Sequence, residues 1–176
     1  AAIGENACMS KNGSSLVFRI CFVCTGNICR SPMAEVILRD LAERRGLGAD
    51  LDITSAGTGE WHVGEKADPR TRAALARAGY SGEEHRAKQF DPAWFAEYDL
   101  IVTFDRGQRR ILRSWAEHER QLALVQPLLS FDPAAGAGTE VPDPYYGNDE
   151  LFDTVRDVIE RACHRLLEQI EPAVRA

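Results

Sequence analysis

The chain alternates between short apolar segments and longer segments with helical periodicity, and this alternation constrains its fold most strongly. The first apolar run, residues 16–23 (LVFRICFV), is long enough for a strand buried on both faces. Residues 51–56 and 100–104 are two further strand candidates, and residues 122–125 are a weaker fourth one. Strands that alternate with helices are typical of a parallel sheet covered by helices on both faces. We therefore expect a doubly wound α/β fold, in which ligands bind beyond the carboxyl ends of the strands.

Capping residues mark the predicted helices. Ser31 and Pro32 predict an N-cap followed by a first helical turn, and Gly46 ends the same helix. The Asp-Pro pairs at 68–69 and 91–92 open two more helices, and residues 106–115 predict another. The last helix has the clearest pattern, because its apolar residues form a single stripe: Leu151, Phe152, Val155, Val158, Ile159, Ala162, Cys163, Leu166, Leu167 and Ile170.

The composition is that of an ordinary globular protein, with 44% hydrophobic and 27% charged residues in a chain of 176. We expect one domain over residues 16–176. Residues 1–15 lack the basic start and apolar centre of a signal peptide, so they predict a flexible extension or a remnant of cloning. The net charge of −6 argues against binding of nucleic acid or of an anionic membrane. No apolar run approaches the ~18 residues of a transmembrane helix.

The five cysteines are odd in number, and three of them lie within residues 21–29. A secreted disulfide scaffold usually has an even, dispersed set, so we expect a reducing, cytoplasmic setting. Cys21 and Cys163 alternate with apolar neighbours and are predicted to be core residues, while Cys8 belongs to the extension. Cys21 and Cys24 match a C-x-x-C pattern, but no second pair accompanies them, which disfavours zinc binding or thioredoxin-like chemistry.

The junction between the first strand and the first helix carries the chemistry: Cys24-Thr-Gly-Asn-Ile-Cys-Arg-Ser31. In a curled loop, successive N–H groups can point inward and bind an anion, and the N-terminus of the following helix adds positive potential. Gly26 and Asn27 are residue types that tolerate a left-handed backbone. The Walker pattern is absent. The segment therefore predicts a phosphate-binding loop formed by Thr25, Gly26, Asn27, Ile28, Cys29 and Ser31.

The two ends of this loop predict its reaction. The amides and the helix end favour the thiolate form of Cys24, which makes it a nucleophile aimed at phosphorus. Arg30 offers a planar fork for two phosphate oxygens. Ser31 could donate a hydrogen bond to the sulfur as it leaves. Cys29 is close enough in sequence to form a disulfide with Cys24, which would make the site redox-sensitive.

The segment V-C-T-G-N-I-C-R-S-P-M-A-E resembles the phosphate-binding loop of the low-molecular-weight protein tyrosine phosphatases. Further similar segments follow in the family's order and extend the match over roughly residues 16–170: Ser55-Ala-Gly-Thr, Trp61, His85 with Arg-Ala-Lys-Gln, and Asp143-Pro-Tyr-Tyr-Gly. The resemblance implies a four-stranded parallel sheet of flavodoxin-like type. It also implies hydrolysis of phosphotyrosine through a phosphocysteine intermediate, with tyrosine-phosphorylated proteins as substrates.

The resemblance also selects the general acid among four Asp-Pro pairs. Asp68 and Asp91 occupy positions where a helix cap is the simpler explanation, and Asp132 precedes a turn of small residues. The resemblance points to Asp143, which would protonate the departing oxygen and then act as base on water.

The remaining assignments concern supporting residues and pocket walls. Ser55 and His85 resemble the partners that hold Asn27 in this family. Trp61, Tyr145 and Tyr146 would form apolar walls that stack on a phenyl ring. No cofactor is implied, and without H-E-x-x-H or clustered carboxylates neither is a metal. We expect a monomer.

Three other functions are weighed against this one. Thioredoxin-coupled arsenate reductases have a similar loop but need two later cysteines, and no cysteine lies between Cys29 and Cys163. Phosphoarginine phosphatases of the same family resemble this loop with a threonine in place of Ile28, and an apolar residue suits an aromatic substrate better. A non-enzymatic phosphate-binding or redox-sensing module is disfavoured, because Cys24, Arg30 and Asp143 are all present.

Two other features are assigned no catalytic role. His62, His118 and His164 are unremarkable in their sequence surroundings. Arginines cluster on the helix predicted at residues 106–115, at positions 106, 109, 110 and 113. A solvated helix face is the simpler interpretation of this cluster, and docking of an anionic partner is the alternative.

Overall fold

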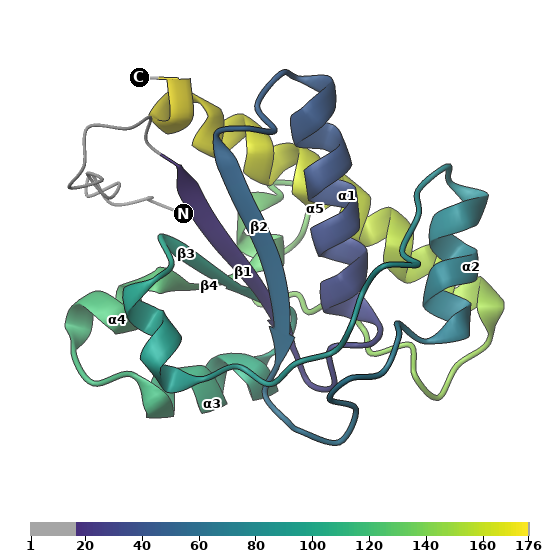
Figure 1. Ribbon diagram of the computed structural model, residues 1–176, viewed down its shortest axis with the longest axis horizontal. Helices are drawn as coiled ribbons and strands as arrows, with labels where there is room; N and C mark the ends of the chain where they lie inside the picture. The colour runs from purple at the N-terminus through teal and green to yellow at the C-terminus, as the bar shows by residue number, and fades with distance from the viewer. Residues whose placement is uncertain (1–16, 176) are drawn as a thin grey trace.

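A computed structural model describes residues 17–175, so the expected extension at residues 1–15, with Cys8, lies outside the described residues. Four parallel strands form one sheet in the order β2-β1-β3-β4. The strands are β1 (Phe18–Cys24), β2 (Leu51–Gly57), β3 (Leu100–Thr103) and β4 (Val125–Pro127). Helices cover both faces of the sheet, which confirms the predicted fold class (Figure 1).

Successive residues of the central strand β1 face two different layers. Ile20 and Phe22 belong to the larger core, which lies under α1 (Arg30–Arg44) and α5 (Asp149–Arg175). Cys21 and Val23 belong to a smaller core, which is closed by η1 (Pro92–Ala96) and α3 (Arg106–Trp115). The helix α2 (Pro69–Arg77) packs against α5 and α1. Because both faces of β1 are covered, the strand is a nearly continuous apolar run.

The strand order places two loops side by side at the carboxyl edge of the sheet. From β1 the chain crosses through α1 to β2 on one side, and it then returns to β3 and β4 on the other side. The loops that follow β1 and β3 therefore meet where the direction of winding reverses. This switch point is the usual ligand site of an open α/β sheet.

Most predicted helix boundaries are confirmed. Asp68 and Asp91 cap their helices by accepting hydrogen bonds from Arg70 N at 2.8 Å and Ala93 N at 2.9 Å. Gly46 has a φ of 71° just beyond α1 and ends that helix as predicted. The eight fully buried members of the α5 stripe include Cys163.

Two local predictions are wrong. Residues 122–124 complete a helix, α4 (Glu119–Leu124), and the fourth strand begins only at Val125, before η2 (Leu128–Phe131). A short apolar run does not by itself distinguish strand from helix. Ser31 is not the N-cap of α1, because Cys29 holds that position. The Ser31 hydroxyl contacts Cys24 and Asn27 instead of a backbone amide.

Candidate active site

Residues 25–29 curl between the end of β1 and the start of α1 with their carbonyl groups bonded to the surrounding segments. The carbonyls of Cys24, Thr25 and Ile28 accept hydrogen bonds from Thr58 N, Gly59 N and Asp68 N at 2.9, 3.0 and 2.9 Å. None of the N–H groups of residues 25–29 donates to an acceptor among residues 17–175. The amide donors of the loop are thus available to a ligand, at the N-terminus of a 15-residue helix. This is the arrangement of an anion-binding nest.

Asn27 holds the loop in its curled shape. Its φ of 58° is the only positive value at a non-glycine residue in the described part of the chain. The side-chain Nδ2 donates to Ser31 Oγ at 2.8 Å and to Ser55 Oγ at 3.0 Å, and Oδ1 accepts from Lys88 N at 3.0 Å. The Asn27 carbonyl lies 2.6 Å from Nε2 of the buried His85. The structure therefore brings both predicted supporting residues, Ser55 and His85, onto Asn27.

Two glycines allow neighbouring groups to approach the loop. A Cβ at Gly57, the last residue of β2, would lie 2.7 Å from the Thr25 carbonyl oxygen. Gly26 does not adopt the left-handed backbone that its residue type permits. Its lack of a side chain makes room for His62, because a Cβ there would lie 2.9 Å from Cδ2 of that ring.

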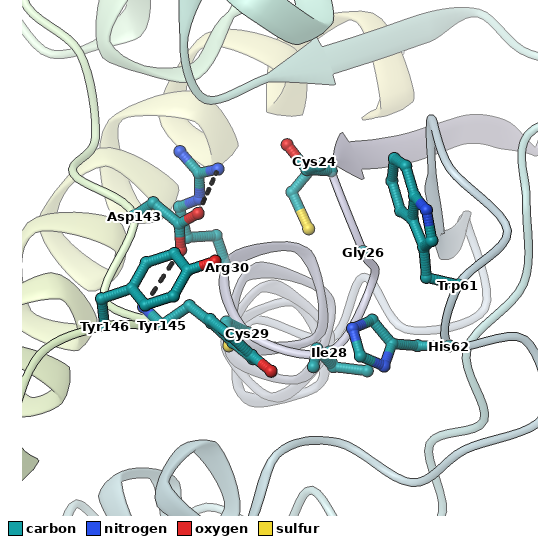
Figure 2. Close-up of a pocket in the computed structure, with 11 residues that line it drawn as sticks. Cys24, Gly26, Ile28, Cys29, Arg30, Trp61, His62, Asp143, Tyr145 and Tyr146 are labelled. Atoms are coloured by element: carbon teal, nitrogen blue, oxygen red, sulfur yellow. Dashed lines mark hydrogen bonds and ion pairs between the residues drawn. The ribbon is translucent and has the colours of Figure 1, made fainter.

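The sulfur of Cys24 lies at the floor of the pocket and points into it (Figure 2). Cys24 is 3% exposed, and its Sγ lies 2.9 Å from Ser31 Oγ. Asn27 Nδ2 donates to this hydroxyl, so the Ser31 proton can be donated either to the sulfur or to the Ala56 carbonyl at 3.4 Å. The hydroxyl can therefore stabilise a negative charge on Sγ.

Arg30 is 2% exposed and is held by groups from two distant loops. Its Nη1 donates to Asp105 Oδ2 at 2.8 Å and to the Val141 carbonyl at 2.9 Å, while Nη2 lies 3.8 Å from Asp143 Oδ2. Burial alone would raise the pKa of Asp105, but its hydrogen bonds from Arg30 and Gln108 outweigh burial and lower that pKa. Gln108 Nε2 also donates to Thr25 Oγ1 at 2.9 Å, which ties α3 to the loop.

The pocket above the loop has a volume of about 260 Å³, and all the predicted wall residues line it. Asp143 stands at the rim with 47% of its side chain exposed, and its Oδ1 accepts a hydrogen bond from Tyr145 N at 3.1 Å. The rings of Tyr145 and Tyr146 meet edge to face, with centroids 5.0 Å apart. Trp61 is 70% exposed and Tyr146 93% exposed, so both rings are free to meet a substrate at the mouth.

Sequence reasoning missed three residues of this site. Asp105 and Gln108 were assigned no role, although an acid directly after the third predicted strand, at the switch point, was an available signal. His62 is not unremarkable: it lines the pocket beside Gly26, and its Nδ1 lies 2.7 Å from Glu65 Oε2. Its position next to Trp61 in sequence was the one indication.

The other cysteines are buried thiols. Cys21 and Cys163 are core residues as predicted, and burial raises the pKa of both. Burial, with a smaller effect from Asp68, also raises the pKa of Cys29 to about 12. Within residues 17–175 no group of three His, Cys, Asp or Glu side chains is arranged to hold a metal ion. No helix in that range is long and apolar enough to cross a membrane.

A sulfur that faces a nest of amide donors is suited to accept a phosphoryl group, and a carboxyl at the rim is placed to exchange protons with the leaving oxygen. Fold and pocket together therefore define a cysteine-dependent phosphatase. The family model for low molecular weight phosphotyrosine protein phosphatase matches residues 19–176. The low molecular weight protein-tyrosine-phosphatase of Streptomyces coelicolor is 50% identical, covering 90% of this chain and 97% of the relative. The chain belongs to this family and is a hydrolase of phosphoric monoesters with phosphoproteins as its substrates.

Solved structures agree with this assignment. YfkJ from Bacillus subtilis superposes with a TM-score of 0.83 at 37% identity, covering 92% of this chain and 98% of YfkJ. The Bacillus subtilis arginine phosphatase YwlE is also similar, with a TM-score of 0.78 at 28% identity, covering 88% of this chain and 96% of YwlE. The fold is thus shared by relatives that act on different phosphorylated residues.

Proposed function

We propose that this chain hydrolyses phosphotyrosine in proteins through a covalent phosphocysteine on Cys24. The observation that carries the proposal is the meeting of Cys24, Arg30 and Asp143 around one pocket. These three groups come from the end of β1, the start of α1 and the loop before α5.

In the first step, the Cys24 thiolate attacks phosphorus and the bond from phosphorus to the phenolic oxygen breaks. Asp143 donates its proton to that oxygen, and tyrosine leaves. Arg30 and the amides of residues 25–29 bind the non-bridging oxygens, which carry charge throughout the transfer.

In the second step, Asp143 takes a proton from water, and the water oxygen attacks phosphorus. The phosphorus–sulfur bond breaks, and inorganic phosphate and the Cys24 thiolate are released. The Ser31 hydroxyl, 2.9 Å from Sγ, supports the sulfur as leaving group. In this scheme Asn27, Ser55 and His85 act by positioning the loop and do not touch the reacting atoms.

The pocket walls favour an aromatic phosphate ester over the alternative, phosphoarginine. Trp61 and Tyr145 provide ring faces for a phenyl group, and Ile28 adds an apolar contact at the loop. A guanidino substrate would instead need polar partners on these walls. Cys29 remains a candidate redox partner of Cys24.

The two substrates are distinguished by measuring kcat/KM on matched phosphotyrosine, phosphoserine and phosphoarginine peptides. We expect the highest value for phosphotyrosine, and a higher value for phosphoarginine would contradict the substrate assignment. Cys24→Ser should abolish turnover, and retained turnover would show that another group is the nucleophile. Asp143→Asn should slow turnover of a substrate with a poor leaving group while sparing the fold.

We also propose that the protein is a cytoplasmic monomer with a single catalytic domain over residues 16–176. The thiol state of Cys21, Cys24, Cys29 and Cys163 is compatible with a reducing compartment. Cell fractionation tests the compartment, and light scattering of the purified chain tests the monomeric state.

A further inference from the structure

Four arginines form an exposed stripe along α3. They are Arg106, Arg109, Arg110 and Arg113, and their spacing places them on one face of the helix, away from the buried Gln108 and Leu112. We call this set the basic stripe. It stands out because the chain as a whole carries a net charge of −6.

The stability of α3 does not account for the basic stripe. Arg106 pairs with Glu140 at 3.3 Å, but no ion pair among residues 17–175 involves Arg109, Arg110 or Arg113. The first turn of α3 holds no acidic residue, so arginines there face the positive end of the helix dipole. Like charges three and four positions apart also repel one another. The contacts within the described chain therefore give Arg109, Arg110 and Arg113 no carboxylate partner that would explain their presence on this face.

The basic stripe borders a groove next to the active site. Arg106 and Arg109 line one wall of a groove of about 500 Å³, and residues 127–140 form much of the rest. Three carboxylates of the groove are already paired with arginines: Asp105 with Arg30, Asp132 with Arg161, and Glu140 with Arg106. The charge of Arg109 is thus left without a counterion in the groove.

The groove also lies within reach of a peptide bound at Cys24. Glu140 lines the groove and Asp143 lines the catalytic pocket, and three residues of chain span at most about 11 Å. An extended peptide advances ~3.4 Å per residue. Side chains three to five positions from a phosphotyrosine can therefore reach the groove and the basic stripe.

We propose that the basic stripe and its groove dock an acidic segment of the phosphoprotein substrate, a few residues from its phosphotyrosine. The proposal rests on the phosphotyrosine phosphatase activity proposed above. Opposite charges raise the rate of encounter and favour the bound complex, while the chemistry at Cys24 is unchanged. The stripe should therefore raise kcat/KM for acidic peptides and leave kcat nearly constant.

The test compares two phosphotyrosine peptides that differ only by Glu or Gln at positions three to five from the phosphotyrosine. With the parent chain, the acidic peptide should have the higher kcat/KM, and added salt should reduce the difference. In the double variant Arg109→Gln/Arg110→Gln, kcat/KM for the acidic peptide should fall about three- to tenfold. The kcat/KM values for the neutral peptide and for a small aryl phosphate should change by less than about twofold.

The double variant Arg44→Gln/Arg165→Gln is the control, because it removes the same charge from the last residue of α1 and from the C-terminal half of α5. It should leave the preference for the acidic peptide intact. An equal loss in the control, or an unchanged preference in Arg109→Gln/Arg110→Gln, would overturn the docking proposal. Binding to phosphatidylserine vesicles without discrimination between the peptides would assign the stripe to a lipid surface instead. If the parent chain cleaves neither the peptides nor the aryl phosphate, the proposed function itself fails.

Discussion

A guanidinium removed from water needs a counter-charge, and Arg30 has a hydrogen-bonded carboxylate on only one side of its fork. Nη1 is taken by Asp105 and the Val141 carbonyl, whereas the nearest carboxylate to Nη2 is Asp143 at 3.8 Å. Asp105 thus balances the positive charge of Arg30 through Nη1, and Nη2 remains directed at the pocket. In the proposed mechanism Asp105 is for this reason a positioning residue for Arg30, the group that would bind phosphate.

Replacing Asp105 with asparagine tests this role. Asp105→Asn removes the counter-charge of Arg30 but keeps a side chain that can cap α3, so we expect kcat/KM on an aryl phosphate to fall about tenfold or more. The control is Asp91→Asn, which alters a similar helix cap on η1 that does not contact the loop. Equal activity in the two variants would exclude a role of Asp105 through Arg30. Both variants should be compared at a single pH near neutrality.

Ser31 yields a second prediction at the level of single residues. Ser31→Ala removes the hydroxyl next to Sγ, so the sulfur becomes a poorer leaving group and breakdown of the phosphocysteine slows. We expect a burst of released phenol equal to the enzyme concentration, followed by a steady rate reduced about tenfold. Ser130→Ala, at a hydroxyl bonded only to the Pro127 carbonyl, should show parent kinetics. A fall in the burst rate with no change in the later rate would contradict this assignment.

Sequence reasoning located those site residues that are contiguous or lie in segments resembling the family. Cys24 to Ser31 form one loop, and its chemistry follows from residue types and from its place between a strand and a helix. Asp105 and His62 are not found in this way, since the only local signals, an acid after a strand and a neighbour of Trp61, do not define a role. Their roles arise only when strand order brings the end of β3 beside the end of β1, and when a glycine opens space for a ring.

At the scale of elements, the end of β2 acts as a template for the catalytic loop. Thr58 N and Gly59 N bond the carbonyls of Cys24 and Thr25, which requires the two backbones to approach closely. Gly57 permits this approach, because any side chain there would meet the Thr25 carbonyl. The glycine is thus required by contact with backbone and not by its own φ.

Gly57→Ala should therefore disturb the loop more than the helices. The added Cβ would lie 2.7 Å from the Thr25 oxygen, and we expect a loss of about 1–3 kcal/mol in the free energy of unfolding. Activity should fall further than the loss of folded protein explains, because the amide donors move. Gly136→Ala is the control, since its nearest contact would be Thr139 Oγ1 at 3.4 Å. Both variants should be measured by urea unfolding and by kcat/KM. If Gly57→Ala keeps the parent stability and activity, the loop can shift to accommodate the added Cβ without cost.

The elements themselves differ in how well the sequence predicts them. The long α5 stripe has the period of an amphipathic helix, and the run of β1 has the length and the Val, Ile and Phe content of a buried strand. The last strand has neither, since β4 is three residues long and directly follows α4. Its position is set by pairing of Val125 with Ile101 of β3, a contact between distant parts of the chain.

At the scale of the molecule, several buried or half-buried aspartates link separate layers through arginines. Asp132 ends η2 and accepts a hydrogen bond from Arg161 of α5 at 2.8 Å, and Asp105 links β3 to Arg30 of α1. Burial alone would raise the pKa of each carboxyl, but the arginines and backbone amides outweigh it and lower both pKa values. The pKa of Asp68 is lowered in the same way, by its hydrogen bonds from Arg70.

This pattern fixes the sign of the pH dependence of stability. A carboxyl whose pKa is lower in the folded state adds stability above its unfolded pKa of about 3.9, and this stability is lost as the pH falls through the folded value. The free energy of unfolding should therefore be constant from neutrality down to about pH 5 and then fall on further acidification.

Asp132→Asn measures what the Asp132–Arg161 pair contributes to the free energy of unfolding. Near neutral pH the variant should lose about 1.5–3 kcal/mol in the free energy of unfolding, the usual value of a hydrogen bond to a charged group. Near pH 2 the parent carboxyl is largely protonated as well, so the two unfolding curves should converge. Asp157→Asn, at an exposed pair with Arg156, should follow the parent at every pH. A constant offset between Asp132→Asn and the parent across the whole range would mean that packing, and not the charge of Asp132, joins η2 to α5.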